Sequence, residues 1–246
     1  MIRDRIKWWL FPGINLHARQ RYRVLPRYFL PPSNGNDGLV LDAGCGNGML
    51  TYQSYLRGNR AIGITIKEGE VERNRRLFNE YLGVPEERLS FRVHNLYEVE
   101  SLGMQFDQII CSEVLEHIRR DEELCRAFWQ ILKPGGVLHL CCPNAEHPDN
   151  KNHPLDPDER GGHVRPGYSF ESYRALLEPI GFELSEPVGL GGPVRQACNK
   201  QITAIQESFG LLPGLLLFAL LGPLQVFDRN HPRVPYSLYV RATKQA

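Results

Sequence analysis

The stretch Val40-Leu41-Asp42-Ala43-Gly44-Cys45-Gly46-Asn47-Gly48-Met49-Leu50-Thr51 decides the fold of this chain. Its apolar start, together with Leu39, predicts a short buried strand that ends at an acid. Three alternating glycines follow the acid, and they let the backbone turn sharply and lie bare against a ligand. A helix that begins after such a turn directs its free N–H groups at whatever occupies the turn. The stretch therefore predicts a strand, a ligand-binding turn and a helix.

The spacing of the glycines separates two kinds of cofactor site. A dinucleotide fingerprint reads G-x-G-x-x-G, whereas here Gly48 comes one residue early and Met49 stands where that fingerprint needs glycine. This spacing disfavours a nicotinamide or flavin oxidoreductase. With h for an apolar residue, the pattern h-h-D-h-G-x-G-x-G resembles motif I of class I S-adenosylmethionine (SAM) methyltransferases. The resemblance implies SAM as the cofactor, bound by Asp42, Gly44, Cys45, Gly46 and Gly48.

Residues 61–66 predict the second strand, and the residue at its end is unusual for the family. Many methyltransferases place Asp or Glu there, and its carboxylate binds the ribose hydroxyls. Here Thr65 takes that position, and Gly63-Ile64-Thr65-Ile66 resembles a variant seen in cyclopropane fatty-acid synthases and tocopherol-type methyltransferases. In the synthases a polar residue five positions later helps to hold the ribose, which implies a ribose contact for Glu70. The alternative is that Glu68 and Glu70 only favour the N-terminus of the next helix.

The third strand and its exit are predicted at residues 91–96. The family places the adenine of SAM at this exit, next to an Asp or Asn side chain and the following backbone N–H. The resemblance therefore implies that Asn95 and Leu96 flank the adenine. Asn95 is equally suited to a plain turn.

An apolar run at 106–111 predicts a central fourth strand, which leads into Ser112-Glu113-Val114-Leu115-Glu116-His117. This segment resembles the family's "EVLEH" box. Residues at the carboxyl end of a parallel strand border the ligand crevice. The resemblance implies cofactor contacts for Ser112 and Glu113, whose carboxylate can bind the SAM amine. His117 can orient or deprotonate an acceptor, or it is a helix-end histidine bonded to a neighbouring backbone group.

A long polar loop is expected between 143 and 167, and long loops above strand ends are usually functional. Within it Gly161-Gly162-His163-Val164-Arg165 resembles the segment that methyltransferases use before their last helix. His163 is therefore the second candidate general base beside His117. The loop also carries His147, His153 and several aspartates, but no compact ligand spacing such as H-x-x-x-H, so no metal site is expected.

The expected fold is α/β: a seven-stranded, Rossmann-like class I methyltransferase sheet in the order 3-2-1-4-5-7-6. Leu132-Lys133-Pro134-Gly135-Gly136 before an apolar strand is a further signature of the same family. The closing antiparallel strand is predicted at 236–242. The resemblance covers roughly Leu39 to Phe182 and this last strand. We expect an N-terminal amphipathic extension at 1–32 and a SAM-binding domain at 33–246, which contains an apolar helical insertion at about 187–234.

Two apolar segments lie outside the expected sheet. The basic and aromatic start of the chain either packs over the cofactor cleft or anchors at a lipid interface, because Trp and cationic side chains suit the headgroup region. The run 209–224 approaches the ~20 residues needed to span a bilayer, but Pro213 and Pro223 interrupt it and both of its flanks return to one sheet. We therefore expect helices that cap the substrate pocket or dip into a membrane face.

Composition sets wider bounds. The 246 residues suit one α/β domain with additions, and 29 basic against 28 acidic residues argue against a nucleic-acid partner. Six cysteines without a C-x-x-C pair indicate reduced, buried thiols in a cytoplasmic protein. No cleavable signal peptide is evident. Membrane association would then be peripheral.

The sequence thus predicts a SAM-dependent methyltransferase that acts on an O, N or C atom of a small-molecule acceptor, one that is hydrophobic or linked to lipid. Two alternatives stay open. One is an enzyme similar to cyclopropane fatty-acid synthases, which share the Thr65 variant. The other is a non-catalytic, membrane-associated protein that binds SAM. The acceptor itself is not visible in the sequence.

Overall fold

The computed structural model describes residues 13–32, 37–156, 158–159, 161–228 and 232–245. The strands of this part of the chain form one eight-stranded sheet in the order β3-β2-β1-β4-β5-β8-β6, with β7 paired to β8 outside that path. They are β1 (Leu39–Ala43), β2 (Arg60–Thr65), β3 (Leu89–Val93), β4 (Phe106–Ser112), β5 (Leu132–Pro143), β6 (Phe182–Leu184), β7 (Val188–Leu190) and β8 (Ser237–Lys244). Pairing is parallel from β3 to β5, and β8 is antiparallel to β5, β6 and β7. The predicted strand order is confirmed, and the short β7 adds an eighth strand to the seven expected.

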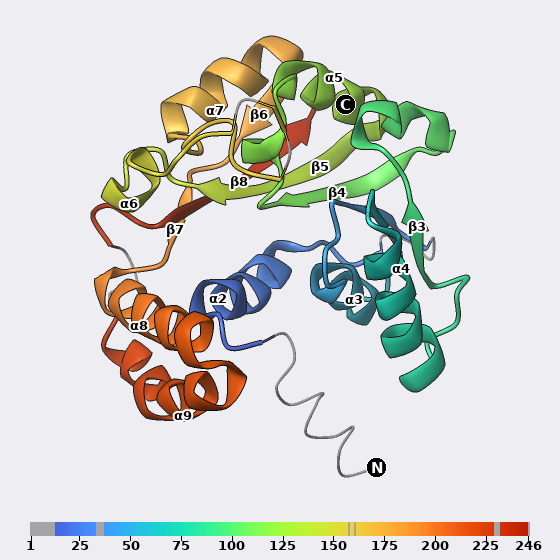
Figure 1. Cartoon of the computed structure of the whole chain (residues 1–246). Helices are drawn as coiled ribbons and strands as arrows, with labels where there is room; N and C mark the ends of the chain where they lie inside the picture. The colour runs from blue at the N-terminus through green and yellow to red at the C-terminus, as the bar shows by residue number, and fades with distance from the viewer. Residues whose placement is uncertain (1–12, 33–36, 157, 160, 229–231, 246) are drawn as a thin grey trace.

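Helices cover both faces of the sheet (Figure 1). On one face lie α5 (Asp121–Ile131) and α7 (Phe170–Leu177), and on the other lie α2 (Leu16–Val24), α3 (Met49–Leu56) and α4 (Glu68–Asn74). Leu124, Phe128 and Ile131 lie on one side of α5 because of their spacing, and this side packs into the largest hydrophobic core. Ser169 caps α7, since its Oγ accepts from the Ser172 N–H at 3.1 Å.

Shorter helical segments connect these elements. They are η1 (Leu25–Tyr28), the π-helical η2 (Arg75–Tyr81) that continues α4, η3 (Leu96–Leu102), η4 (Leu115–His117), α6 (Pro148–Lys151) and η5 (Glu178–Ile180). The predicted loop at 143–167 therefore contains one turn of helix, α6.

The apolar insertion folds into helices beside the sheet. After β7 come α8 (Pro193–Phe209), α9 (Leu211–Leu221) and η6 (Gly222–Phe227), before the chain returns to β8. Within the described residues, none of the helices has the length and apolarity that a bilayer span requires. The basic and aromatic start of the chain, for which packing over the cofactor cleft or anchoring at a lipid interface is expected, lies at 1–12, outside the described residues. The remainder of the predicted N-terminal extension contains α2 and η1.

The glycine turn after β1 is fixed by backbone hydrogen bonds. The N–H groups of Gly44 and Cys45 both donate to the Ile64 carbonyl, at 3.0 and 2.9 Å. Gly48 opens α3 with φ +74°, and a Cβ there would lie 2.8 Å from the rings of Phe78 and Phe91. Glycine is therefore required at this position by both backbone conformation and packing. All six cysteines are unpaired and buried, as predicted.

Candidate active site

The candidate cofactor residues lie at the carboxyl ends of four neighbouring strands. Asn95 follows β3, Thr65 ends β2, the glycine turn follows β1, and Ser112 ends β4. Since the sheet order is β3-β2-β1-β4, these groups form a row along one edge. A row of this kind suits an elongated ligand that crosses several strand ends.

The centre of the row is a turn with a bare inner surface. Gly46 has φ +50°, and no described atom lies within 4 Å of a Cβ built there. The Asn74 side-chain amide donates to the Gly46 carbonyl at 2.9 Å and so fixes the turn. Burial raises the pKa of the Cys45 thiol, so this side chain stays neutral. The turn therefore offers backbone and open space, which fits a ligand bound against the main chain, as SAM requires.

Asp42 supports the turn from inside the sheet. Its Oδ2 accepts from the Thr51 hydroxyl at 2.6 Å, and only 2 % of the residue is exposed. Burial raises the pKa of Asp42 to about 6, while the hydrogen bonds from Thr51 oppose that rise. The hydrogen bond between Asp42 and Thr51 thus connects β1 to α3.

Thr65 and Glu70 are brought together beside the turn. The Thr65 hydroxyl donates to Glu70 Oε2 at 2.8 Å, and Lys67 Nζ lies 3.8 Å from the other carboxylate oxygen. Thr65 is buried, whereas Glu70 is partly open to solvent. The pair leaves carboxylate lone pairs available, which can accept hydrogen bonds from a diol. Glu70 also lies in the first turn of α4, so the N-terminal role weighed from the sequence applies too.

At the β3 end of the row, Asn95 Oδ1 accepts from the Tyr97 N–H at 3.1 Å and caps η3. This is the turn role that the sequence allowed. The side chain is exposed, and the neighbouring Leu96 is buried. The two residues therefore present a polar amide beside an apolar surface.

At the β4 end, Glu113 has an unusual backbone conformation. Its φ is +57°, a region that non-glycine residues seldom occupy and that costs on the order of 1–3 kcal/mol. Its Oε2 lies 3.2 Å from Arg21 Nη1, and its Oε1 is buried without a hydrogen-bond partner in the described part of the chain. Burial raises the pKa of Glu113, and the Arg21 charge opposes that rise. A strained, incompletely paired carboxylate at a strand end indicates a ligand contact.

Sequence analysis missed the two residues of α2 that complete the row. Arg21 pairs with Glu113, and the Tyr22 hydroxyl accepts from the Asn47 amide within the glycine turn at 3.0 Å. α2 therefore covers the cofactor row. No local pattern marks Arg21 or Tyr22, because their partners lie far along the chain and meet them only in the folded protein.

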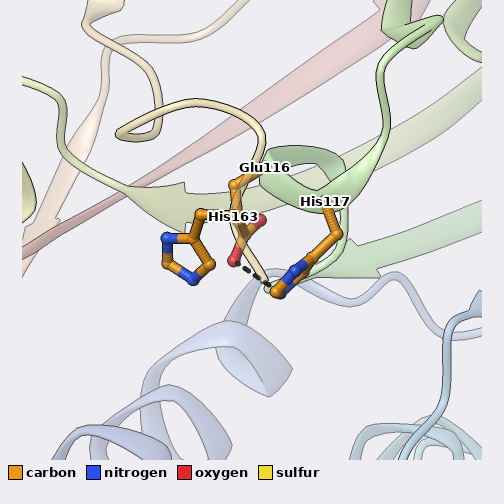
Figure 2. Close-up of side chains that lie close together, drawn as sticks. All are labelled: Glu116, His117 and His163. Atoms are coloured by element: carbon orange, nitrogen blue, oxygen red, sulfur yellow. Dashed lines mark ion pairs between the residues drawn. The ribbon is translucent and has the colours of Figure 1, made fainter. Parts of the chain in front are cut away.

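A second cluster lies beside the row and contains Glu116, His117 and His163 (Figure 2). His117 Nδ1 is 2.8 Å from the Gly162 carbonyl, which can only accept, so the ring proton sits on Nδ1. This leaves the lone pair on Nε2, which lies 3.9 Å from Glu116 Oε1. The His117 and His163 rings meet edge to face with centroids 4.8 Å apart. The structure thus brings the two predicted bases together.

The groups around His117 are buried and poorly paired. Neither Glu116 oxygen has a hydrogen-bond partner among the described residues, and its own backbone N–H and the Cys142 thiol only partly offset the effect of burial on its pKa. Burial, and then the charge of Glu113, raise the pKa of Glu116 to about 8. Burial and the two neighbouring histidines lower the pKa of His163 to about 4, and its Nδ1 is buried without a partner. Unpaired buried polar atoms of this kind favour the binding of a polar ligand group.

The same three side chains could also share a cation. One donor atom each from Glu116, His117 and His163 lie within 4.8 Å of one another. Carboxylate and imidazole are common ligands of divalent transition metals. The sequence showed no compact metal-binding spacing because His163 comes from a different loop. The expectation of no metal remains a prediction, which a chelator can test.

A cavity of about 420 Å³ opens beside His163, a volume that suits a small ligand. His17 of α2 and Tyr236 form part of its wall and stack with ring centroids 4.2 Å apart. Gln196, Lys200 and Thr203 of α8 also line it. The insertion therefore supplies polar side chains to the wall of the cavity next to the histidines.

Comparisons with known proteins agree with this arrangement. A family model described as a methyltransferase domain matches residues 15–186. The mitochondrial ubiquinone biosynthesis O-methyltransferase of Homo sapiens is 31 % identical over 152 residues, which cover 56 % of this chain and 40 % of that protein. The first curated relatives are matched over less than half of their own length.

Solved structures share the fold at low identity. Magnesium protoporphyrin IX methyltransferase from Synechocystis PCC 6803 with bound S-adenosylhomocysteine has a TM-score of 0.62 and 17 % identity, covering 98 % of this chain and 94 % of that one. The [4+2]-cyclase SpnF has a TM-score of 0.60 and 20 % identity, covering 93 % of this chain and 82 % of that one. At these identities the likeness shows the fold alone.

Proposed function

This chain belongs to the family of class I SAM-dependent methyltransferases, and we propose that it methylates an O, N or C atom of a small hydrophobic or lipid-linked acceptor. One observation carries the proposal. The β4 end of the row, at Ser112 and Glu113, leads directly along the chain into Glu116 and His117 of η4, and His163 packs against His117. A cofactor site and a site for proton transfer thus adjoin each other.

The cofactor row can be divided by chemistry. Thr65 and Glu70 would hold the ribose hydroxyls, and Asn95 and Leu96 the adenine. Ser112 and Glu113 would hold the amino-acid end, where Arg21 lies beside the carboxylate. When bound, SAM supplies a methyl group on a positively charged sulfur. α2 would close the row at the glycine turn and at Glu113, which Tyr22 and Arg21 contact.

The acceptor cluster would align the nucleophile and remove its proton. His117 has its lone pair on Nε2 because Nδ1 donates to the Gly162 carbonyl. A hydroxyl or amine that donates to Nε2 would be oriented and could transfer its proton there. An imidazolium at His117 would lie 3.9 Å from Glu116 Oε1, and its charge would favour ionisation of this buried carboxyl, which would stabilise the imidazolium in turn. His163 bounds the same space with a neutral ring. Alignment of the acceptor supplies much of the rate in such reactions.

Two features support the class of acceptor. The insertion that contains α8 and α9 carries exposed leucines on α9, which favour a hydrophobic or lipid-linked substrate met by peripheral contact with a membrane. The cavity beside His163 has mostly polar α8 side chains in its wall, so it suits the polar, accepting end of such a substrate. The curated relatives include O-methyltransferases, which favours oxygen as the accepting atom.

Labelled SAM with extracts tests the proposal. The protein is incubated with methyl-labelled SAM and with the lipid and aqueous phases of a cell extract separately. We expect label to enter a component of the lipid phase. Binding of SAM without label transfer to either phase would favour the non-catalytic alternative.

Deuterated SAM separates methylation from ring formation. A methyltransferase product keeps all three deuterons of the methyl group, whereas a cyclopropane product loses one when the ring closes. The cyclopropane alternative rests on Thr65, which lies beside Glu70 as that resemblance implies. Loss of one deuteron would overturn the methylation proposal.

A further inference from the structure

The helix α9 is apolar on all sides, yet only one side of it is covered. Leu215, Phe218 and Leu221 pack against the small core that contains Cys198 and Ile202 of α8. On the other side, Leu212, Leu216 and Leu220 are 70 %, 68 % and 71 % exposed. Their spacing of four residues places them in one stripe along the helix.

The exposed stripe continues into η6. Val226 and Phe227 are each 75 % exposed, and Phe209 before α9 is 69 % exposed. No charged residue occurs between Glu207 and Asp228. We call the stripe Leu212–Leu216–Leu220 with Val226 and Phe227 the α9 surface. An uncharged apolar surface of this extent marks a site of interaction.

The chemistry of the α9 surface favours lipid over a protein partner. Its five side chains contain no hydrogen-bond donor or acceptor. Protein interfaces carry about one hydrogen bond per 100–200 Å² and depend on Tyr, Trp and Arg anchors. Acyl chains require no hydrogen bonds, and the α9 backbone already satisfies its own. An apolar groove of 630 Å³, lined by Leu216, Phe218 and Pro223 among others, provides room for such chains.

Cationic side chains lie at the edge of the groove beside this surface. The Arg19 guanidinium of α2 lies 4.9 Å from the centroid of the Phe218 ring, which lines the groove together with Leu216. Arg23 is exposed on the same helix. The acidic residues that flank this segment in sequence are Glu207 and Asp228. The Asp228 side chain is buried and pairs with Arg195 at 3.5 Å, while Glu207 is exposed at the end of α8. Arginines that flank an apolar helix favour the anionic headgroups of a membrane.

We propose that the α9 surface docks on the anionic leaflet of a lipid bilayer, with α9 lying in the plane of the interface. At 11 residues, α9 is about 16 Å long and cannot cross the ~30 Å hydrocarbon layer. The inference rests on the proposed function in one respect: α8 contacts α9 and also lines the cavity beside His163, so docking would bring that cavity near its lipid-linked acceptor.

Vesicle co-sedimentation of the full chain tests the proposal. The probes are vesicles of phosphatidylcholine alone and vesicles with added phosphatidylglycerol, each at low and high salt. We expect binding to the anionic vesicles that weakens as salt screens the arginines. Leu212→Gln/Leu216→Gln/Leu220→Gln should reduce binding about tenfold or more per leucine removed. The control Leu56→Gln/Tyr81→Gln replaces exposed apolar residues on other elements and should bind as the parent does.

A labelled cysteine locates the contact. Because the six native thiols are buried, Leu216→Cys can be labelled with a polarity-sensitive dye. We expect its emission to shift to the blue with anionic vesicles, whereas the same dye on Leu56→Cys should not shift. Absence of binding to anionic vesicles at low salt would overturn the proposal. Vesicle binding by the triple variant equal to that of the parent would also overturn it. A parent protein that is a dimer, together with a triple variant that is a monomer and still binds vesicles, would show that the α9 surface binds a second copy of the chain instead of lipid.

SAM binding, measured on the same samples, separates this proposal from the proposed function. A triple variant that binds SAM normally and loses lipid supports docking. A parent protein that binds vesicles but neither binds SAM nor transfers its methyl group would leave docking intact and contradict the proposed function.

Discussion

The cofactor row and the acceptor cluster differ in how their polar groups are paired. In the row, Asp42 is bonded to Thr51, Thr65 to Glu70, and Asn95 to the Tyr97 N–H. In the cluster, neither oxygen of Glu116 has a strong donor, and His163 Nδ1 has no partner in the described structure. Glu113 shows both kinds of pairing: one carboxylate oxygen lies near Arg21, and the other has no hydrogen-bond partner in the described structure.

The two regions also differ in sequence distance. Three contacts of the row span only 2 to 9 residues, because each pairs a strand end with the turn or helix that follows it. The contacts of Arg21 and Tyr22 with the row are the long-range exceptions. The contact of His117 with the Gly162 carbonyl spans 45 residues. The difference teaches that the strand ends of the cofactor half are fixed largely by local contacts, while the acceptor half depends on a long loop. Variants in the row should therefore affect SAM affinity, and variants in the cluster should affect transfer.

The largest effect is expected in the cluster. His117→Gln removes the basic Nε2, and label transfer to the accepting fraction should fall about 100- to 10,000-fold. SAM affinity, measured by isothermal titration, should stay at the parent value. A parallel loss of SAM affinity would break the division between the two regions.

A chelator distinguishes the two uses of the cluster. If His117 acts as a base, the parent protein should keep its transfer activity in EDTA. Activity that disappears in EDTA and returns with added Zn²⁺ or Mn²⁺ would show that Glu116, His117 and His163 work through a metal.

The next effect concerns the open turn. Gly46→Val places a β-branched side chain in the ligand space at φ +50°, so SAM binding should weaken at least about 100-fold, or ~2.7 kcal/mol. Gly83→Val is the matched control, because Gly83 also has positive φ and open space but lies at the end of the π-helical segment η2. Normal SAM affinity in folded Gly46→Val would refute the assignment of the turn.

Asp42 predicts a pH dependence of stability. Because burial raises its pKa from 3.8 to about 6, the native protein holds this proton more tightly than the unfolded chain does. The stabilisation is complete below about pH 4 and is lost as pH rises through 6, a change of about 3 kcal/mol. Urea unfolding at several pH values should show this fall in the free energy of unfolding in the parent protein and not in Asp42→Asn. Identical pH profiles for the two proteins would exclude it.

The smallest effects concern the ribose pair. Glu70→Ala should cost about 1.5–3 kcal/mol of SAM affinity, the range for hydrogen bonds to a charged group, and Thr65→Val should cost less, about 0.5–1.5 kcal/mol. Titration calorimetry of both variants checks the order. Normal binding by Glu70→Ala together with weak binding by Thr65→Val would show that the ribose contact is assigned to the wrong residue.

The sequence by itself determined the sheet, the turn and the family. Glycine spacing, apolar runs and helix caps act over a few residues, so they are visible without the fold, and the predicted strand order is confirmed. The resemblance to cyclopropane fatty-acid synthases implies that Glu70 acts together with Thr65, and the structure places the two in contact. Their role in binding ribose stays a prediction.

Only the tertiary structure decided what surrounds the acceptor. It placed Arg21 and Tyr22 against the cofactor row, joined His163 to His117, and left one side of α9 uncovered. The sequence predicted each histidine singly but not their contact, nor the isolation of Glu116 between them. The physical reason is that these contacts join segments far apart in the chain. Their partners are chosen by the packing of α2, α8 and the loop after β5 on the sheet, which no short pattern encodes.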